Sequence, residues 1–396
     1  MDYQQENNVW VIGHKNPDTD SICAAICYAN LKNRLQDGFH YIPKRAGSIN
    51  EETKYVLQHF GVEPPEYAED AGAQVKDIAF RRTAGVSGHI SLKKAWELMK
   101  TENVMTLAVT SASDKLEGLI ITGDIAESYM DVYDNHILSR ARTQYKNIVE
   151  TLNGTLLAGN EHAYFLRGKV VVATGSRDVI EECIESDDLV IVGDRDETHI
   201  CALEENASCM VVTGGTQVSA QVLEMANRRD CVVIITPYDT FTAARLINQS
   251  MPIKYFMKKE NFVTFDIDDY VDEVREVMSK KRHRDFPVLD DQRRYLGMVS
   301  RRNLLNMHKK KLILVDHNEK SQAIDGIEGA EILEIIDHHR LGSLETMSPV
   351  FFRNQPLGCP STIVYQMYCE SGIEIEEKIA GLLLSAILSD LSLIHI

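Results

Sequence analysis

A histidine and two aspartates stand close together in the stretch GHKNPDTDS, residues 13–21. They are His14, Asp18 and Asp20, and they follow directly on the apolar run 9–12. Carboxylates crowded together repel one another, and each is costly to remove from water unless a cation or hydrogen-bond donors compensate. The stretch therefore suggests a metal site at the end of a buried strand.

Three later apolar segments end in the same kinds of side chain. The segment KLILVDHNEKSQ leads into Asp316, EILEIIDHHRLGS leads into the Asp-His-His triplet 337–339, and LLLSAILSD closes on Asp390. Oxygen-rich ligands with two imidazoles suit manganese, magnesium or cobalt better than a structural zinc. The candidate ligands are His14, Asp18, Asp20, Asp316, His338 and Asp390.

Six ligands are too many for one ion that must also keep open positions. The pattern therefore favours two metal ions that share a carboxylate. Such a pair can lower the pKa of a bridging water and neutralise a phosphoryl oxygen during in-line attack. The chemistry that follows is hydrolysis of a phosphoester or a phosphoanhydride.

The elements that must position these residues begin with a strand over 9–12 and an amphipathic helix from 21 to about 36, closed by Gly38. This order is typical of an α/β domain. In open parallel sheets, ligands bind at the carboxyl ends of the strands. The acidic loop stands at such an end.

Two segments, 91–125 and 269–305, share one order: a helical stripe, two short strands around a polar turn, and a polar helix start. They resemble the paired CBS motifs that bind adenine nucleotides. The resemblance implies a nucleotide site at Ser300, Arg301 and Asn303 in the second repeat and at Asp124 in the first. Ile121 occupies the position of the expected hydroxyl in the first repeat, which favours one nucleotide over two.

A long α/β insert separates the repeats. Helical stretches alternate there with strand-like runs at 169–173, 189–192, 208–213 and 231–236. The strings GDRDETH and VVTGG resemble the DRTGG domain. A Gly-Gly turn before a helix could cradle a phosphate, but a plain strand-to-helix turn is the better interpretation.

The strings GHKNPDTDS, LVDHNE, DHH and LGCPSTIVYQMY resemble the DHH phosphoesterase superfamily and, within it, the family II inorganic pyrophosphatases. The CBS–DRTGG–CBS insert resembles their nucleotide-regulated branch. The implied fold is α/β, a parallel-sheet DHH domain interrupted by a CBS motif pair and an inserted α/β DRTGG domain. The expected boundaries are 1–68 and 309–390 for the two parts of the DHH domain, 69–135 and 251–308 for the CBS motifs, and 136–250 for the DRTGG domain.

The resemblance also implies a role for each candidate residue. It gives His14 and Asp18 to one metal, Asp20 and His338 to the other, and Asp316 to both as a bridge. The remaining assignments are Asp390 as a further ligand, His339 and Gln322 at the substrate phosphate, and Asp337 as the residue that orients its neighbouring histidines.

The implied activity is hydrolysis of inorganic pyrophosphate to two phosphates with Mn²⁺ or Co²⁺, and with Mg²⁺ alongside the substrate. The implied regulators are AMP and ADP as inhibitors and ATP or diadenosine polyphosphates as activators, and the implied assembly is a homodimer. Ser21 directly after Asp20 favours pyrophosphate over the phosphodiesterase branches. Two alternatives stay open: a DHH phosphodiesterase acting on short or cyclic dinucleotides, and a nucleotide-sensing module with a vestigial metal half.

The charge and composition of the chain argue against some classes of binding partner. The net charge of −17 argues against a nucleic-acid partner. The sequence has no apolar run of 18 residues and begins with a polar segment, which predicts a cytoplasmic protein without a membrane partner. Eight cysteines without a CxxC pair suggest reduced core thiols. Cys23 and Cys27, one helical turn apart, could chelate a metal, but a core position is favoured for both.

The sequence departs from the family pattern after Asp390, where Leu391 follows and the chain reaches Ile396. The family continues there with a domain whose lysine and arginine clamp pyrophosphate. One coding of the tail LSLIHI is the transposase mosaic end used to prepare sequencing libraries. We therefore expect 391–396 to be non-native, the clamp domain to be missing, and the chain as written to be nearly inactive.

Overall fold

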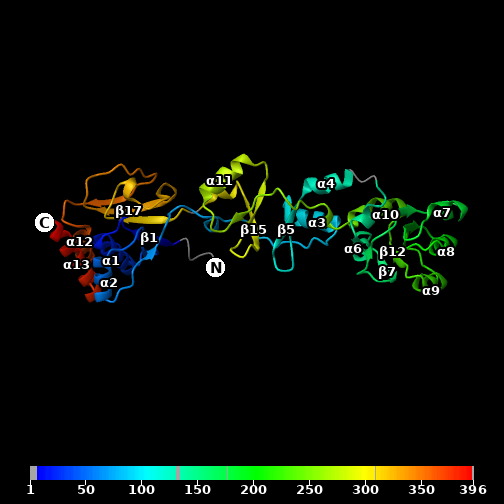
Figure 1. Ribbon diagram of the computed structural model, residues 1–396, viewed down its shortest axis with the longest axis horizontal. Coiled ribbons are helices and arrows are strands. Elements are labelled where there is room, and N and C mark those ends of the chain that lie inside the picture. Colours follow the sequence, from blue (N-terminus) through cyan, green and yellow to red (C-terminus); the bar gives the residue numbers. More distant parts are fainter. Residues whose placement is uncertain (1–6, 131–133, 176, 308, 395–396) are drawn as a thin grey trace. The chain divides into compact units, whose positions relative to one another are not determined.

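The computed structural model describes residues 7–130, 134–175, 177–307 and 309–394. The chain divides into two compact units. The first comprises 1–80, 267–284 and 300–396, and the second comprises 81–266 and 285–299. Figure 1 labels the main helices and strands of both units.

The first unit is built on a six-stranded sheet in the order β18-β17-β16-β1-β2-β3, and every neighbouring pair is parallel. This confirms the predicted parallel-sheet α/β class. The strands are β1 (Asn8–Ile12), β2 (His40–Arg45), β3 (Glu66–Tyr67), β16 (Lys311–Val315), β17 (Glu331–Asp337) and β18 (Phe351–Asn354).

One face of this sheet is covered by four helices, α1 (Thr19–Leu35), α2 (Glu51–His59), α12 (Pro360–Ser371) and α13 (Glu377–Ile394). The blue α1 and the red α12 and α13 lie together in Figure 1 although more than 300 residues separate them. Their shared core includes Tyr28, Tyr368 and Leu382, and it also contains Cys23 and Cys27. Burial raises the pKa of both thiols, in agreement with a core position for these cysteines.

The other face of the sheet packs against the segment after β16, which contains the short 3₁₀ turns Lys320–Gln322 and Ile327–Gly329. Ile12, Leu312 and Leu314 point to this side and contact Ile324 and Ile327. Side chains of successive strand residues alternate between faces, so the continuous apolar runs seen in the sequence fill both layers.

The strand order reverses direction between β1 and β16. The chain runs from β1 through α1 to β2 on one side, and from β16 to β17 and β18 on the other. Neighbouring loops diverge at such a switch point and leave a crevice at the carboxyl ends of the strands. His14 follows β1 and Asp316 follows β16, so both residues stand at this crevice.

The second unit contains a sheet in the order β7-β12-β11-β10-β9, with β7 antiparallel to β12. Its strands are β7 (Thr155–Ala158), β9 (Val170–Val172), β10 (Leu189–Val192), β11 (Cys209–Val212) and β12 (Val232–Ile235). The last four confirm the four strands predicted for the insert. One face packs against α7 (Arg177–Cys183), α8 (Asp196–Glu204) and α9 (Ala220–Arg228), and the other against α6 (Tyr145–Thr151) and α10 (Thr240–Leu246).

The Gly-Gly turn after β11 is a plain connection. Gly214 and Gly215 both have positive φ, which suits glycine. Their N–H groups donate to the carbonyls of Tyr238 and Thr236, each at 2.8 Å. Because these donors are already used, the structure favours the interpretation as a strand-to-helix turn over a phosphate cradle.

The two predicted repeats have the same order of elements. The first contains α3 (Leu92–Thr101), β4 (Thr106–Thr110), β5 (Leu116–Ile121) and α4 (Thr122–Met130), and the second contains α11 (Val271–Lys280), β14 (Asp285–Leu289), β15 (Tyr295–Ser300) and a 3₁₀ turn at Asn303–Asn306. The shorter elements are β6 (Thr143–Gln144), β8 (Tyr164–Phe165), β13 (Phe265–Asp266), α5 (Ile137–Arg140) and 3₁₀ turns at Val75–Asp77, Ile247–Ser250 and Ile253–Tyr255. Among the helices described, none has the length and apolar character needed to cross a bilayer.

Candidate metal centre

The crevice at the switch point holds a cavity of about 360 Å³ in the first unit. Its lining consists of His14, Lys15, Asn16, Asp18, Asp316, Ser321, Gln322, His338, His339 and Asp390. Acidic and imidazole side chains from four separate segments thus meet in one place. Asp20 lies deeper and is 2% exposed.

The loop after β1 is shaped by local contacts around Ser21. The Ser21 hydroxyl accepts the N–H of His14 at 3.2 Å, and a Cβ on Gly13 would lie only 1.9 Å from that hydroxyl oxygen. A glycine is therefore required at position 13. Asp18 caps α1, because its Oδ1 accepts the N–H of Ser21 at 2.9 Å. Its Oδ2 stays on the side of His14, 3.8 Å from Nε2.

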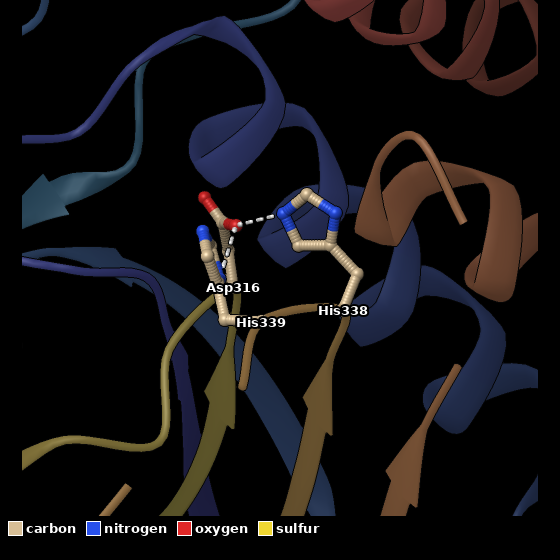
Figure 2. A group of neighbouring side chains, drawn as sticks. All are labelled: Asp316, His338 and His339. Atoms are coloured by element: carbon tan, nitrogen blue, oxygen red, sulfur yellow. Dashed lines mark ion pairs between the residues drawn. The ribbon is translucent and has the colours of Figure 1, made fainter. Parts of the chain in front are cut away.

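Asp316 lies between two imidazoles. Its Oδ2 is 3.2 Å from His14 Nε2, and its Oδ1 is 3.5 Å from His338 Nε2. Asp316 has φ of 67°, a left-handed conformation that is uncommon for a residue other than glycine. Figure 2 shows His338 and His339 beside the Asp316 carboxylate. One carboxylate therefore faces a different histidine with each oxygen.

The segment after β17 is held by Asp337, which is fully buried. Its Oδ1 accepts the N–H groups of His338 and His339 at 2.8 and 3.2 Å, and it lies 2.8 Å from His339 Nδ1. Its Oδ2 accepts from the amide of Asn318. The Nδ1–H of His338 donates to the Leu357 carbonyl at 3.0 Å. Both imidazoles are thereby oriented through Nδ1.

Three groups of side chains bring potential ligand atoms within 4.8 Å of one another: His14, Asp18 and Asp316; Asp316, His338 and His339; and Asp20, Cys359 and Asp390. All six candidate ligands occur in these groups, and Asp316 belongs to two of them. Oδ2 of Asp20 is buried without a hydrogen-bond partner. A buried, unpartnered carboxylate oxygen is costly unless a cation compensates it.

The electrostatics of the group agree with a cation site. Burial and the nearby Asp316 raise the pKa of Asp20. Burial lowers the pKa of His14, but the carboxylates of Asp18 and Asp316 outweigh it and raise that pKa to about 10. For His338, burial again lowers the pKa, while the Asp316 carboxylate and the Leu357 carbonyl raise it to about 9. Bound protons thus compensate the acidic group when no cation is present, and a bound cation would release them.

The remaining predicted substrate residues lie at the same cavity. Gln322 lines it, and its carbonyl accepts the N–H of Lys15 at 2.8 Å. Lys15 is the one lysine or arginine in the described lining, and its ammonium donates to Asp325 at 2.6 Å.

The predicted nucleotide residues form similar local turns in the two repeats. The N–H and the hydroxyl of Ser300 donate to Asn303 Oδ1 at 2.8 and 2.7 Å. In the first repeat, the N–H of Ile121 donates to Asp124 Oδ2 at 2.9 Å. Arg301 donates to the carbonyl of His283 at 2.8 Å. Ser300, Arg301 and Asn303 belong to the first unit and Asp124 to the second.

Four residues at the centre received no role from the sequence: Asn318, Leu357, Cys359 and Ser361. Leu357, Cys359 and Ser361 belong to the string LGCPSTIVYQMY, which carried the family resemblance but contains no acidic or imidazole side chain. Asn318 stands two residues after Asp316. This position close to a candidate ligand is the feature of the sequence that could have pointed to Asn318.

Comparison with known proteins extends over nearly the whole chain. A model of the DRTGG domain matches residues 147–250, and a model of the CBS domain matches residues 253–309. The cobalt-dependent inorganic pyrophosphatase of Clostridium perfringens is 42% identical over 382 residues, which are 96% of this chain and 69% of that protein. The "probable manganese-dependent inorganic pyrophosphatase" of Thermotoga maritima is 39% identical with the same coverage.

A solved structure resembles the regulatory part. It is the crystal structure of the CBS and DRTGG domains of the regulatory region of Clostridium perfringens pyrophosphatase, complexed with the activator diadenosine tetraphosphate. The likeness covers 58% of this chain and all of that chain, with 36% identity and a TM-score of 0.56. The chain belongs to the family II inorganic pyrophosphatases, in the branch that carries CBS and DRTGG domains.

Proposed function

We propose that the centre binds two divalent cations and hydrolyses inorganic pyrophosphate to two phosphates. One observation carries the proposal: the two carboxylate oxygens of Asp316 face different imidazoles, Oδ2 that of His14 and Oδ1 that of His338. A carboxylate in this position suits a bridge between two ions. The relatives named above are cobalt- and manganese-dependent, and the oxygen and imidazole donors fit either ion, with Mg²⁺ entering alongside the substrate.

We propose the division of ligands that the family resemblance implies. His14 and Asp18 would hold one cation, Asp20 and His338 would hold the other, Asp316 would serve both, and Asp390 would complete the set. Two cations bound there would lower the pKa of a water and neutralise charge on the phosphoryl oxygens. The protein contributes the fixed positions of these side chains, so little reorganisation is needed during the reaction.

His339 has the position of a substrate residue. Asp337 engages its Nδ1 at 2.8 Å, and the imidazolium form of the ring can donate from Nε2 to a phosphate oxygen. Gln322 lines the same cavity and can contribute a second hydrogen bond. Asp337 acts on the substrate only through the histidines that it orients.

The direct test is phosphate release from pyrophosphate with Mn²⁺ or Co²⁺. Because the chain covers 69% of the Clostridium perfringens relative, the assay includes a chimera that continues after Asp390 with the C-terminal part of that relative. We expect phosphate release by the chimera and nearly none by its Asp316→Asn variant. Cleavage of a dinucleotide instead of pyrophosphate would contradict the proposal and favour a phosphodiesterase.

We infer further that adenine nucleotides regulate this activity through the CBS pair. The similar solved regulatory region holds diadenosine tetraphosphate as an activator, which supports the same class of ligand here. Ser300, Arg301, Asn303 and Asp124 are the candidate contacts, and AMP, ADP and ATP are the further candidate regulators. A nucleotide changes activity only if it binds two arrangements of the protein with different affinity.

A homodimer is the assembly that we propose. Exposed apolar side chains line a cavity of about 880 Å³ in the second unit, between α3, α4 and the segment 244–249. Trp96, Tyr129 and Met130 are 43%, 50% and 67% exposed there. Large exposed apolar patches often mark protein contacts, and a second copy of the CBS motifs is the expected partner.

Replacing Trp96 with glutamate is expected to convert the dimer to a monomer in light scattering coupled to gel filtration, because the charge would be buried without a partner. Met347→Glu is the matched control, since Met347 is 96% exposed in the first unit. A Trp96→Glu protein that stays dimeric would exclude this surface as the interface.

A further inference from the structure

The carboxylates of Asp18 and Asp20 are held in different ways. Asp18 caps its own helix, because its Oδ1 accepts from Ser21 three residues later. Asp20 accepts from a residue 341 positions away: Oδ1 receives the hydroxyl of Ser361 at 2.5 Å and the N–H of Ser361 at 3.2 Å. The orientation of Asp20 therefore depends on a distant segment.

This segment is the start of α12. Pro360 is the first residue of the helix, and the side chain of the preceding Cys359 makes no capping hydrogen bond. The first N–H groups of a helix lack partners within the helix and favour negative charge. Asp20, at the start of α1, supplies a carboxylate acceptor there, so the two helices are joined at the centre by one side chain.

The consequence lies in the second oxygen of Asp20. Oδ1 is occupied by Ser361, and Oδ2 is buried without a hydrogen-bond partner. Ser361 is itself fully buried, so water does not compete for its hydroxyl. One carboxylate oxygen of Asp20 lies within 4.8 Å of ligand atoms of Cys359 and Asp390.

The same segment orients a second candidate ligand. The carbonyl of Leu357 accepts the Nδ1–H of His338 at 3.0 Å, which leaves Nε2 as the nitrogen with a free lone pair. Metal-binding histidines commonly donate their other N–H to a backbone carbonyl, and such outer contacts fix the tautomer and the ring orientation. Residues 357–361 thus hold both Asp20 and His338.

We propose that the segment 357–361 positions the Asp20–His338 half of the metal centre, with Ser361 as the residue that engages Asp20 Oδ1 and thereby leaves Oδ2 free to bind a cation. The proposal rests on the two-cation centre proposed above. Ser361 is a positioning residue, since it acts through Asp20. In the half of the centre that contains His14 and Asp18, the hydrogen bonds that shape the loop are made with Ser21.

The test is a titration of the cation-free chain with Co²⁺. Calorimetry measures the affinities, and visible absorption reports on the bound Co²⁺. Ser361→Ala removes the hydroxyl and keeps the backbone N–H. We expect Ser361→Ala to lower the affinity for one of the two Co²⁺ ions by roughly 10- to 100-fold and to change the visible absorption of that ion. The affinity for the other ion should stay the same. Ser371→Ala is the matched control at the far end of α12, where the hydroxyl donates to the Met367 carbonyl at 2.7 Å.

The outcomes distinguish the role of Ser361 from the existence of the two-cation centre. Two unchanged Co²⁺ affinities in Ser361→Ala would overturn the positioning role, and equal weakening of both ions would also overturn it, because a general loss of structure would have that effect. Circular dichroism and thermal unfolding of the cation-free variant identify such a loss. Failure of the unaltered chain to bind two Co²⁺ ions would overturn the proposed centre itself.

Discussion

Replacing Asp316 with asparagine is expected to weaken the binding of both cations. The loss of affinity should be larger than for any other single substitution in the centre. Asp316 is 3% exposed and, among the residues that the structure describes, is the one side chain that belongs to both groups around His14 and His338. Removing one partner of a buried charged pair costs about 3–5 kcal/mol. Each 1.4 kcal/mol is a factor of ten, so Co²⁺ binding measured by calorimetry should weaken roughly a hundredfold to several thousandfold.

Asp291→Asn is the control for this substitution. It makes the same chemical change at an exposed turn of the second unit, and it should leave Co²⁺ affinity unchanged. Far-ultraviolet circular dichroism of both variants shows whether the fold is retained. If Asp316→Asn retained the fold and bound one cation with unaltered affinity, Asp316 would not be a bridge.

Removing the cations is expected to destabilise the first unit strongly. Without them, Asp18, Asp20, Asp316 and Asp390 lie close together, and burial together with the neighbouring carboxylates raises the pKa of Asp20 and of Asp390. A ligand at about a thousand times its Kd stabilises the folded state by about 4 kcal/mol. For a unit of this size, that stabilisation corresponds to a rise in Tm of roughly 10 °C.

Differential scanning calorimetry with Mn²⁺ or Co²⁺, and then with a chelator, measures this difference. The transition of the first unit should move, and that of the second unit should stay where it is, because the candidate ligands belong to the first unit. Asp316→Asn should remove most of the shift. A similar shift in both units would indicate nonspecific cation binding.

The sequence predicted the candidate ligands because each follows an apolar strand or closes an apolar helix. Parallel strands place their carboxyl ends at one edge of a sheet, so His14 and Asp316 could be brought together without knowledge of the packing. The strand order between β1 and β16 then explains why the cavity lies there. The core positions of Cys23 and Cys27 followed in the same way from their place on an apolar helix.

The contacts that orient the ligands could not be predicted in this way. Ser361 meets Asp20 across 341 positions, and no periodic pattern links a serine at the start of one helix to an aspartate at the start of another. Leu357 acts through its backbone carbonyl, which every residue has.

Whether two cations share Asp316 can be seen by anomalous diffraction from crystals of the chain grown with Mn²⁺ or Co²⁺. We expect two peaks, one beside His14 and Asp18 and the other beside Asp20 and His338, with the Asp316 carboxylate between them. A single peak, or two peaks that do not share Asp316, would contradict the two-cation centre.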